Sequence, residues 1–346
     1  MKKFLSLLLA GVLCVATLTA CSKNGSDTPN NGDDGSGSGE VITLKVGHDA
    51  AETVPIAIGL AEFERLVEER TNGAVQVEVY NNGTMGSASD YVVNCQLGTL
   101  DMGTSNQSVV SSFIPELVAC DIPYIFESYE HADAAFKGEL YDYFAQQVRD
   151  NMQLELLAIW EVGFRNLTNS KHPVNSVADV AGLRLRTMDN PVHIEFWQSL
   201  GADPVPMSWG EAYTAMQQKA IDGQENPLVY SYFSDFTDVA PYISIWRYAY
   251  DAHPFMLSES LWNKLTAEEQ QLFVEVSDEW IGVQRQMMRE AYDGAYQSCL
   301  DEGCTIVELT DDEIATFKAE ADKTSAPYIE ELSVAWELLQ KCDPKK

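Results

Sequence analysis

Positive charge is scarce in this sequence. Its 346 residues include 22 lysines and arginines against 53 aspartates and glutamates, which gives a formal net charge of −31 at pH 7. A surface this negative repels phosphate backbones, so the composition argues against nucleic acid as a partner. Long apolar runs are also missing beyond the N-terminal region, so no later segment reaches the length of a transmembrane helix.

Motifs of familiar catalytic chemistry are missing as well. The five histidines show no metal-binding spacing such as H-E-x-x-H. The chain has no G-x-S-x-G, no Walker A loop and no dinucleotide fingerprint after a predicted strand. Cysteines do not form the close pairs typical of zinc sites. We therefore expect a protein that is not an enzyme and that holds neither a cofactor nor a metal ion.

Cysteines give little further direction. Five of the seven lie beyond residue 21, and an odd number leaves at least one thiol free or paired outside the chain. Cys299 and Cys304 bracket a turn at residues 301–303 and could form a disulfide across it. The sequence does not decide whether they do.

The N-terminus has the pattern of an export signal. Lys2 and Lys3 supply its positive charge, and residues 4–15 supply its apolar core. The following "LTAC" resembles the bacterial lipoprotein box, in which a lipidated cysteine becomes the mature N-terminus. We therefore predict a lipoprotein signal peptide at residues 1–20 and a lipid anchor at Cys21. The alternative is an ordinary signal peptide with a chance cysteine.

Residues 21–40 are predicted to form a flexible tether. They include "SKNGSDTPNNGDDGSGSG", which is too rich in Gly, Ser, Asn and Asp to bury an apolar core. Loss of the signal peptide removes Lys2 and Lys3, so the formal charge falls from −31 to −33. The resulting picture is an acidic extracytoplasmic protein attached to the cell membrane, in the periplasm or on the outer face of the cytoplasmic membrane.

The first half of the remaining chain alternates strand and helix patterns. Period-2 hydrophobicity predicts strands, and apolar positions at helical spacing predict helices between them. The predicted strands are residues 42–48, 74–80 and 100–105, and the predicted helices are residues 56–69 and 89–97. This βαβαβ order indicates an α/β fold with a mostly parallel sheet and helices on both faces.

A second α/β unit repeats the plan. Residues 154–168 are predicted to form a long strand leaving the first domain, and residues 183–187 a second strand. Ser176 with Asp179, and Ser208 with Glu211, have the spacing of capping boxes that begin helices. From residue 266 to about residue 300 the chain is predicted to be one helix, long enough to brace both units.

Two arginines stand out in so acidic a chain. Arg165 and Arg186 fall at or near the ends of two predicted strands, where open α/β sheets bind ligands. A guanidinium there can hold a carboxylate through two hydrogen bonds. The amide of Asn226, in "DGQENP", strengthens this interpretation. The alternative is that each arginine pairs with one of the protein's own acids.

The segments "VADVAGLRLRT" and "LGADPVPMSWGEAYTAMQQKAIDGQENP" resemble the dicarboxylate-binding (DctP) type of solute-binding protein from tripartite ATP-independent periplasmic (TRAP) transporters. The similarity covers about residues 44–265, with a looser helical continuation. It implies a two-domain periplasmic-binding-protein-like fold with a ligand cleft between the domains. It also implies that Arg186 binds the ligand carboxylate, that Arg165 and Asn226 assist, and that Trp209 lines the pocket. For Trp209, core packing beside Pro206 is the alternative.

Some positions depart from relatives that bind sialic acid. Asp49 and Asn106 replace the asparagine and glutamate of those proteins, so sialic acid is an unsuitable ligand by this resemblance. Asp49, Asn106 and Gln107 together suit the hydroxyl groups of a ligand. Asp49 has two alternatives, pairing with a ligand amine or capping the helix that follows it. The pair Arg247-Tyr248 also departs from relatives, and its role is open.

From the resemblance we expect domain I to comprise residues 41–162 plus about 251–291, and domain II residues 163–250 plus about 292–346. The expected ligand is an organic acid, with a sugar acid such as a uronate as first choice. An aromatic or keto acid is the alternative, with Trp209, Tyr91 and Tyr124 lining an apolar pocket.

The expected partners are TRAP permease subunits driven by an ion gradient. A sensing module for a signalling receptor is the other functional class.

Overall fold

The structure, a computed structural model, describes residues 41–343. The predicted signal peptide, the tether and Cys21 lie outside the described residues. Within residues 41–343 the strands form one mixed sheet in the order β2-β1-β3-β8-β4-β7-β5-β6, and β9 pairs with β8. We call the β1–β3 side of this sheet the first lobe and the β5–β7 side the second lobe. The fold is a two-domain α/β fold, as expected.

The first lobe follows the predicted βαβαβ order. Its elements are β1 (Ile42–Gly47), α1 (Pro55–Arg70), β2 (Val75–Tyr80), α2 (Ala88–Gln96) and β3 (Met102–Thr104). The strand β1 pairs in parallel with both β2 and β3. Helix α1 buries Leu60, Phe63 and Val67, the apolar face expected from their spacing.

The second lobe repeats the arrangement with shorter strands. Its elements are α6 (Val177–Val180), β5 (Arg184–Thr187), α7 (Pro191–Ser199), β6 (Asp203–Pro206), α8 (Trp209–Gln217) and β7 (Gly223–Pro227). Strand β5 pairs in parallel with β6 and β7. Both predicted capping boxes are present, at Ser176 with Asp179 and at Ser208 with Glu211.

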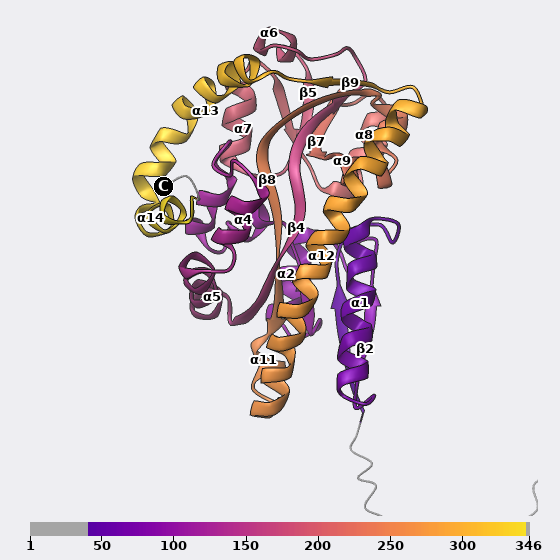
Figure 1. Ribbon diagram of the computed structural model, residues 1–346, viewed down its shortest axis with the longest axis vertical. Helices are drawn as coiled ribbons and strands as arrows, with labels where there is room; N and C mark the ends of the chain where they lie inside the picture. Colours follow the sequence, from indigo (N-terminus) through magenta and orange to yellow (C-terminus); the bar gives the residue numbers. More distant parts are fainter. Residues whose placement is uncertain (1–40, 344–346) are drawn as a thin grey trace, which may run out of the picture. The chain divides into compact units, whose positions relative to one another are not determined.

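Two long antiparallel strands join the lobes. They are β4 (Leu154–Asn169), which the sequence predicted, and β8 (Tyr242–Ser258), which it did not. Figure 1 shows them side by side through the centre of the molecule. Strand β8 is buried along almost its whole length, as β4 is, so neither strand alternates; Pro254 within β8 argues further against a central strand. Because β8 also pairs antiparallel with β3, and β4 with β7, the prediction of a mostly parallel sheet is wrong at the centre.

The pairing of β4 with β8 slips where they pass between the lobes. Arg165 pairs with Ala249 but Leu167 pairs with Ser244, so residues 245–248 bulge opposite Asn166. The Asn166 side chain closes this bulge by accepting hydrogen bonds from the backbone N–H groups of Trp246 and Arg247, both at 3.0 Å. Another slip lies beside Gly163, whose φ of 118° only glycine adopts readily.

Helix α12 (Ala267–Asp301) braces the fold as predicted. It packs against α1, against β4 and against α9 of the second lobe. Gln284 on this helix bonds both backbone groups of Glu161 on β4, donating at 2.6 Å and accepting at 3.0 Å. The ring of Trp280 contacts Phe63 of α1 at 5.5 Å between centroids. These contacts fix the helix to the strands that join the two lobes.

Further helices cover the sheet and complete the described chain. They are α3 (Gln107–Val110), the 3-10 helix η1 (Pro115–Asp121), α4 (Tyr129–Ala135), α5 (Glu139–Met152), α9 (Leu228–Phe233), α10 (Phe236–Val239) and α11 (Glu259–Trp262). After α12 come β9 (Thr305–Glu308), α13 (Asp311–Glu331) and α14 (Ser333–Cys342). Helix α14 returns to pack on η1, α4 and α5, well before β4 in the sequence.

Cys299 and Cys304 are free in the structure, as are the other cysteines of residues 41–343. The backbone N–H of Cys304 donates to the carbonyl of Cys299 at 2.8 Å, which brings the two residues together at the end of α12.

Candidate ligand-binding site

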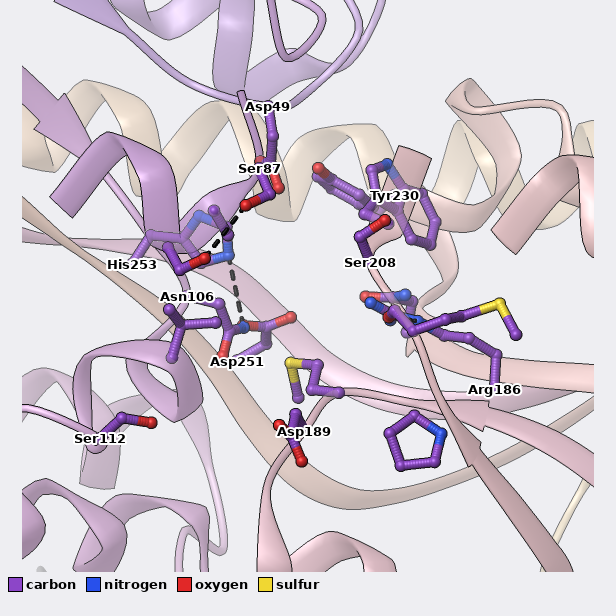
Figure 2. A pocket seen from close by; sticks show the side chains of 18 of the residues that line it. Asp49, Ser87, Asn106, Ser112, Arg186, Asp189, Ser208, Tyr230, Asp251 and His253 are labelled. Carbon is purple, nitrogen blue, oxygen red and sulfur yellow. Dashed lines mark hydrogen bonds and ion pairs between the residues drawn. The ribbon is translucent and has the colours of Figure 1, made fainter. Parts of the chain in front are cut away.

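A cavity of about 410 Å³ opens between the two lobes. Its walls come from the carboxyl ends of parallel strands on both sides: Asp49 follows β1, Asn106 follows β3, and Asp189 follows β5. This is the edge where open α/β sheets bind ligands. Figure 2 shows Asp49, Ser87, Asn106 and His253 facing Arg186, Ser208 and Tyr230 across the space.

Arg186, on β5, is a buried cation with no acidic partner. Only 5% of the residue is exposed, yet it makes no ion pair with any residue that the structure describes. Its Nε donates to the carbonyl of Met207 at 3.1 Å, and its guanidinium lies 5.6 Å from the ring centroid of Trp209. Burial lowers the pKa of Arg186 to about 10, and the nearby Arg165 adds to the decrease. The group remains positively charged at neutral pH and has N–H donors to spare.

Arg165, on β4, has the opposite environment. Its guanidinium forms ion pairs with Glu225 on β7 and Asp251 on β8, all three side chains being at most 2% exposed. It also donates to the backbone carbonyl of Glu225 at 2.6 Å. Burial by itself would lower the pKa of Arg165, but the two carboxylates outweigh it and raise the pKa well above its ordinary value. For this arginine, the alternative of pairing with the protein's own acids is what the structure shows, although Arg165 does line the cavity.

Tyr248 belongs to the same cluster. Its hydroxyl donates to Oε2 of Glu225 at 2.5 Å, and its ring is fully buried. Its neighbour Arg247 is exposed, has a φ of 52°, lies in the bulge of β8 and is not among the residues that line the cavity. Arg247 and Tyr248, whose roles the sequence left open, therefore differ: Tyr248 is a buried hydrogen-bond donor, and Arg247 is an exposed residue of the bulge.

Asn226 lines the cavity at the end of β7. Its Nδ2 donates to Oε1 of Gln224 at 2.8 Å, and Gln224 in turn donates to Thr168 at 2.8 Å and to Ser231 at 2.9 Å. The segment "GQENP" is therefore a buried strand with its polar groups paired across the sheet.

Trp209 is the first residue of α8 and lines the cavity beside Arg186. Its ring stacks on Phe236 at 4.5 Å and contacts Tyr230 at 5.0 Å between centroids. The residue is partly buried. The ring therefore packs on Phe236 and Tyr230 while the residue also borders the cavity, and its part in ligand binding stays a prediction.

The first-lobe predictions have mixed outcomes. Asp49 lines the cavity and does not cap α1, whose N-cap is Val54. Asn106 also lines the cavity, where Nδ2 donates to Asp251 and Oδ1 accepts from the backbone of Ser108 at 2.7 Å.

Gln107 is not brought to the cavity. Its Nε2 donates to the carbonyls of Cys120 and Tyr250, at 3.1 and 2.9 Å, and to Asp121 at 3.0 Å. As the first residue of α3 it turns into the protein interior, so its expected part in ligand binding is wrong. Tyr91 and Tyr124, suggested for an apolar pocket, do not line the cavity either.

Several lining residues were not predicted. Asp251 and His253 lie two apart on β8, so they share one face of a strand that the sequence did not reveal. Burial alone would raise the pKa of Asp251, but Arg165 and His253 outweigh it and lower the pKa below its ordinary value. The remaining unpredicted polar residues of the lining are Ser87, Ser89, Ser112, Asp189, Ser208 and Tyr230. Polar residues two apart within "YAYDAHPFML" were the available signal.

The family model described as bacterial extracellular solute-binding protein, family 7 (DctP), matches residues 46–331. The chain belongs to this family. Its members include the solute-binding proteins of TRAP transporters, so the resemblance seen in the sequence is confirmed. This is a family of substrate-binding transport components and not of enzymes.

Relatives within this DctP family differ in their ligands. A solute-binding protein of Roseobacter denitrificans is 31% identical over 94% of both chains, and its crystal structure with bound L-galactonate has a TM-score of 0.80, covering 88% of this chain and 99% of that one. The sugar acid binding protein of Advenella mimigardefordensis, solved with galactonate, also has a TM-score of 0.80, with 26% identity over 87% and 96% of the chains. The C4-dicarboxylate-binding periplasmic protein of Rhodobacter capsulatus is 27% identical over 81% of this chain and 84% of that one.

Membership of the DctP family places the protein among extracytoplasmic binding proteins that work with membrane permease subunits. None of the helices within residues 41–343 has both the length and the apolar character needed to cross a bilayer.

Proposed function

We propose that this protein captures a sugar acid, such as a uronate or an aldonate, and delivers it to a TRAP permease. The observation that carries the proposal is Arg186, a buried guanidinium in the cavity without an acidic partner. A buried charge left uncompensated costs stability, so a ligand carboxylate is the natural partner for it. A carboxylate accepts two parallel hydrogen bonds from a guanidinium, which fixes the orientation of the ligand.

Asn226 and Trp209 complete the carboxylate end of the proposed site. Asn226 uses one Nδ2 hydrogen for Gln224, and the second hydrogen is available to the ligand. Trp209 borders Arg186 and offers an apolar surface to the carbon chain. Arg165 serves mainly as a positioning residue, because its ion pairs hold Glu225 and Asp251, and Asp251 lines the cavity.

The opposite wall suits hydroxyl groups. Ser87, Ser89 and Asn106 border the cavity there, together with Asp49. Hydroxyls and amides both donate and accept, so this wall matches a chain of alcohol groups better than an aromatic ring. Relatives solved with galactonate and with D-glucuronate support this ligand class.

An aromatic or keto acid is the second candidate. Trp209 and Tyr230 form an aromatic corner beside Arg186, and a relative from Escherichia coli, 29% identical over 72% of this chain and 75% of that one, is named for binding 2,3-diketo-L-gulonate. A module that senses the same acid for a receptor is also compatible with the cavity. Genes for two membrane subunits beside this one favour transport, and a sensor kinase gene favours sensing.

The proposed function includes closure of the two lobes around the ligand. Residues 41–162 with about 251–291 would form one body, and residues 163–250 with about 292–346 the other. The register slips of β4 beside Gly163 and Asn166 support a hinge at this point, since bulges interrupt the ladder where the strands cross between lobes. The packing of α14 on η1, α4 and α5 favours assigning residues 333–342 to the first body instead. A ligand that bonds both walls favours the closed state.

A lipid anchor at Cys21, preceded by a signal peptide at residues 1–20, remains part of the proposal. It would hold the protein at the membrane beside the permease, with residues 21–40 as a tether. Labelling of cells with a radioactive fatty acid tests it: wild-type protein should carry label and Cys21→Ala should not.

A thermal-shift screen against organic acids tests the ligand class. Ligand at a hundred times its dissociation constant adds about 2.7 kcal/mol of stability, a readily measured rise in Tm. We expect uronates and aldonates to raise Tm. A rise with aromatic or keto acids alone would shift the assignment to the second candidate, and no rise with any carboxylate would contradict the site.

A further inference from the structure

Both sugar acids and C4-dicarboxylates are bound by relatives of this chain, so the family leaves open how many carboxylates the ligand carries. We propose that Asp49 restricts the site to acids with one carboxylate, by presenting an unpaired negative charge to the end of the ligand that lies away from Arg186. The proposal rests on the proposed function, because it takes Arg186 as the partner of the first carboxylate.

The charges that line the cavity are unevenly matched. Asp251 is occupied by Arg165, by the amide of Asn106 and by His253, whose Nε2 lies 3.5 Å from its Oδ1. Once this cluster is set aside, Arg186 is the lining cation left for a ligand within the described residues. A single ligand carboxylate neutralises the charge of Arg186, so no lining cation of the described residues is left for a second carboxylate.

Asp49 contacts no cation among the described residues, although its charge acts on Arg186 across the cavity and opposes the decrease in the pKa of Arg186. Asp49 lines the cavity on the first-lobe wall, is partly buried, and makes neither an ion pair nor a hydrogen bond with any residue from 41 to 343. Its neighbour His48 adds no positive charge, because Nδ1 accepts a hydrogen bond from the backbone of Ala50 at 3.0 Å and burial lowers the pKa of the ring. Figure 2 shows Asp49 on the side of the cavity opposite Arg186.

A second ligand carboxylate would therefore meet Asp49 without a cation to separate them. Like charges brought together in a partly desolvated site repel strongly, and such repulsion is a common device for rejecting a wrong partner. A hydroxyl at the same place would instead donate a hydrogen bond to Asp49, and this bond favours it because a charged acceptor strengthens the interaction. Asp49 thus both attracts the correct group and repels the incorrect one.

D-Galactonate and galactarate form a suitable pair of probes. They have the same carbon chain and the same hydroxyl configuration, and differ in carrying an alcohol or a carboxylate at the far end. Galactarate cannot avoid Asp49 by reversing, because whichever end binds Arg186 leaves the other carboxylate opposite. D-Gluconate and D-glucarate form a second pair of the same design.

The test is calorimetric titration of the purified protein and its variants with both pairs. We expect wild type to prefer the monocarboxylate by at least about 100-fold. Asp49→Asn should reduce this preference at least about tenfold, mainly by tightening the dicarboxylate. Because Asp49 has no bond to other described residues, the variant should fold as wild type does.

Glu52→Gln is the matched control. Glu52 lies three residues after Asp49 and its loss changes the net charge equally, but the residue is exposed and does not line the cavity. We expect the preference of this variant for the monocarboxylate to stay within about threefold of wild type. An equal change in both variants would assign the selectivity to net charge and overturn the role of Asp49.

Two other results would overturn the proposal. Wild type that binds galactarate as tightly as D-galactonate, with both lost in Arg186→Ala, would refute the role of Asp49 while leaving the proposed function intact. Failure of wild type to bind either member of either pair, or a uronate such as D-glucuronate, would refute the sugar-acid assignment itself, and the inference with it.

Discussion

Two arginines line the same cavity in environments that differ in one respect. Arg165 on β4 and Arg186 on β5 are both at most 5% exposed. Arg165 is held by Glu225 and Asp251, whereas Arg186 has a backbone carbonyl and an indole ring. A buried charge with internal partners is part of the folded structure, and one without them is an unfinished interaction that a ligand can complete. The comparison teaches that burial alone does not identify a ligand-binding arginine. What distinguishes the two arginines is whether the protein itself supplies an acidic partner.

The largest expected effect is on stability at Arg165. Arg165→Met leaves Glu225 and Asp251 buried without their cation, which should cost about 3–5 kcal/mol of unfolding free energy. Urea denaturation of the ligand-free protein measures it. Arg184→Met is the control: Arg184 pairs with Asp222 at 2.8 Å, but its side chain is 39% exposed and Lys171 still pairs with Asp222 at 3.1 Å, so the loss should be about 1 kcal/mol. A smaller loss of unfolding free energy in Arg165→Met than in Arg184→Met would contradict the role of Arg165 as a structural cation.

Arg186 should show the reverse pattern. Arg186→Ala should weaken binding of a cognate sugar acid at least about 100-fold, because two charge-assisted hydrogen bonds are lost. Its unfolding free energy should stay within about 1 kcal/mol of wild type, since no internal ion pair is broken. Titration and urea denaturation of the same preparation measure both quantities. Wild-type affinity in Arg186→Ala would remove the basis of the proposed site.

Tyr248 sharpens the comparison by testing the cluster around Arg165. Tyr248→Phe removes the donor to Glu225 and should cost about 1–2 kcal/mol of unfolding free energy. Tyr213→Phe serves as control, since the Tyr213 ring packs on Phe236 and its hydroxyl has no hydrogen bond among the described residues. Equal unfolding free energies of Tyr248→Phe and Tyr213→Phe would show that the hydrogen bond from Tyr248 to Glu225 does not stabilise the fold.

The smallest effect concerns pH. The folded pKa of Asp251 is depressed, so its stabilisation is fully present above its unfolded pKa of about 4 and is lost as the pH falls through the folded value. The difference in unfolding free energy between wild type and Asp251→Asn should therefore shrink by about 1 kcal/mol between pH 6 and pH 3. A difference that grows on acidification would mean that Asp251 is not stabilised as an anion.

Local signals in the sequence predicted much of the fold. Alternation located β1 and β2, the segment "LELLAIWEVGFRNLT" indicated β4, and the capping boxes at Ser176 and Ser208 located the starts of α6 and α8. Strand β8 was missed although β4, which is also buried along its length, was found; β8 differs in carrying Pro254, a residue that cannot donate to the ladder and argues against a central strand. Without β8 the antiparallel centre of the sheet could not be foreseen, since pairing depends on contacts distant in the chain.

The site was predictable only in outline. Arg186, Trp209, Asn226, Asp49 and Asn106 were all placed at the cavity from strand ends and family resemblance. The pairing of Arg165 could not be foreseen, because its partners lie 60 and 86 residues away. Gln107 was misassigned since the direction of one side chain in a first helical turn depends on packing that spacing does not reveal.

A crystal structure of the protein with bound D-galactonate or D-glucuronate tests the central claim most directly. We expect the ligand carboxylate to lie within hydrogen-bond distance of the Arg186 guanidinium, with Arg165 still paired to Glu225 and Asp251. A carboxylate bound by Arg165 in place of those acids, or one held away from Arg186, would contradict the assignment of the two arginines.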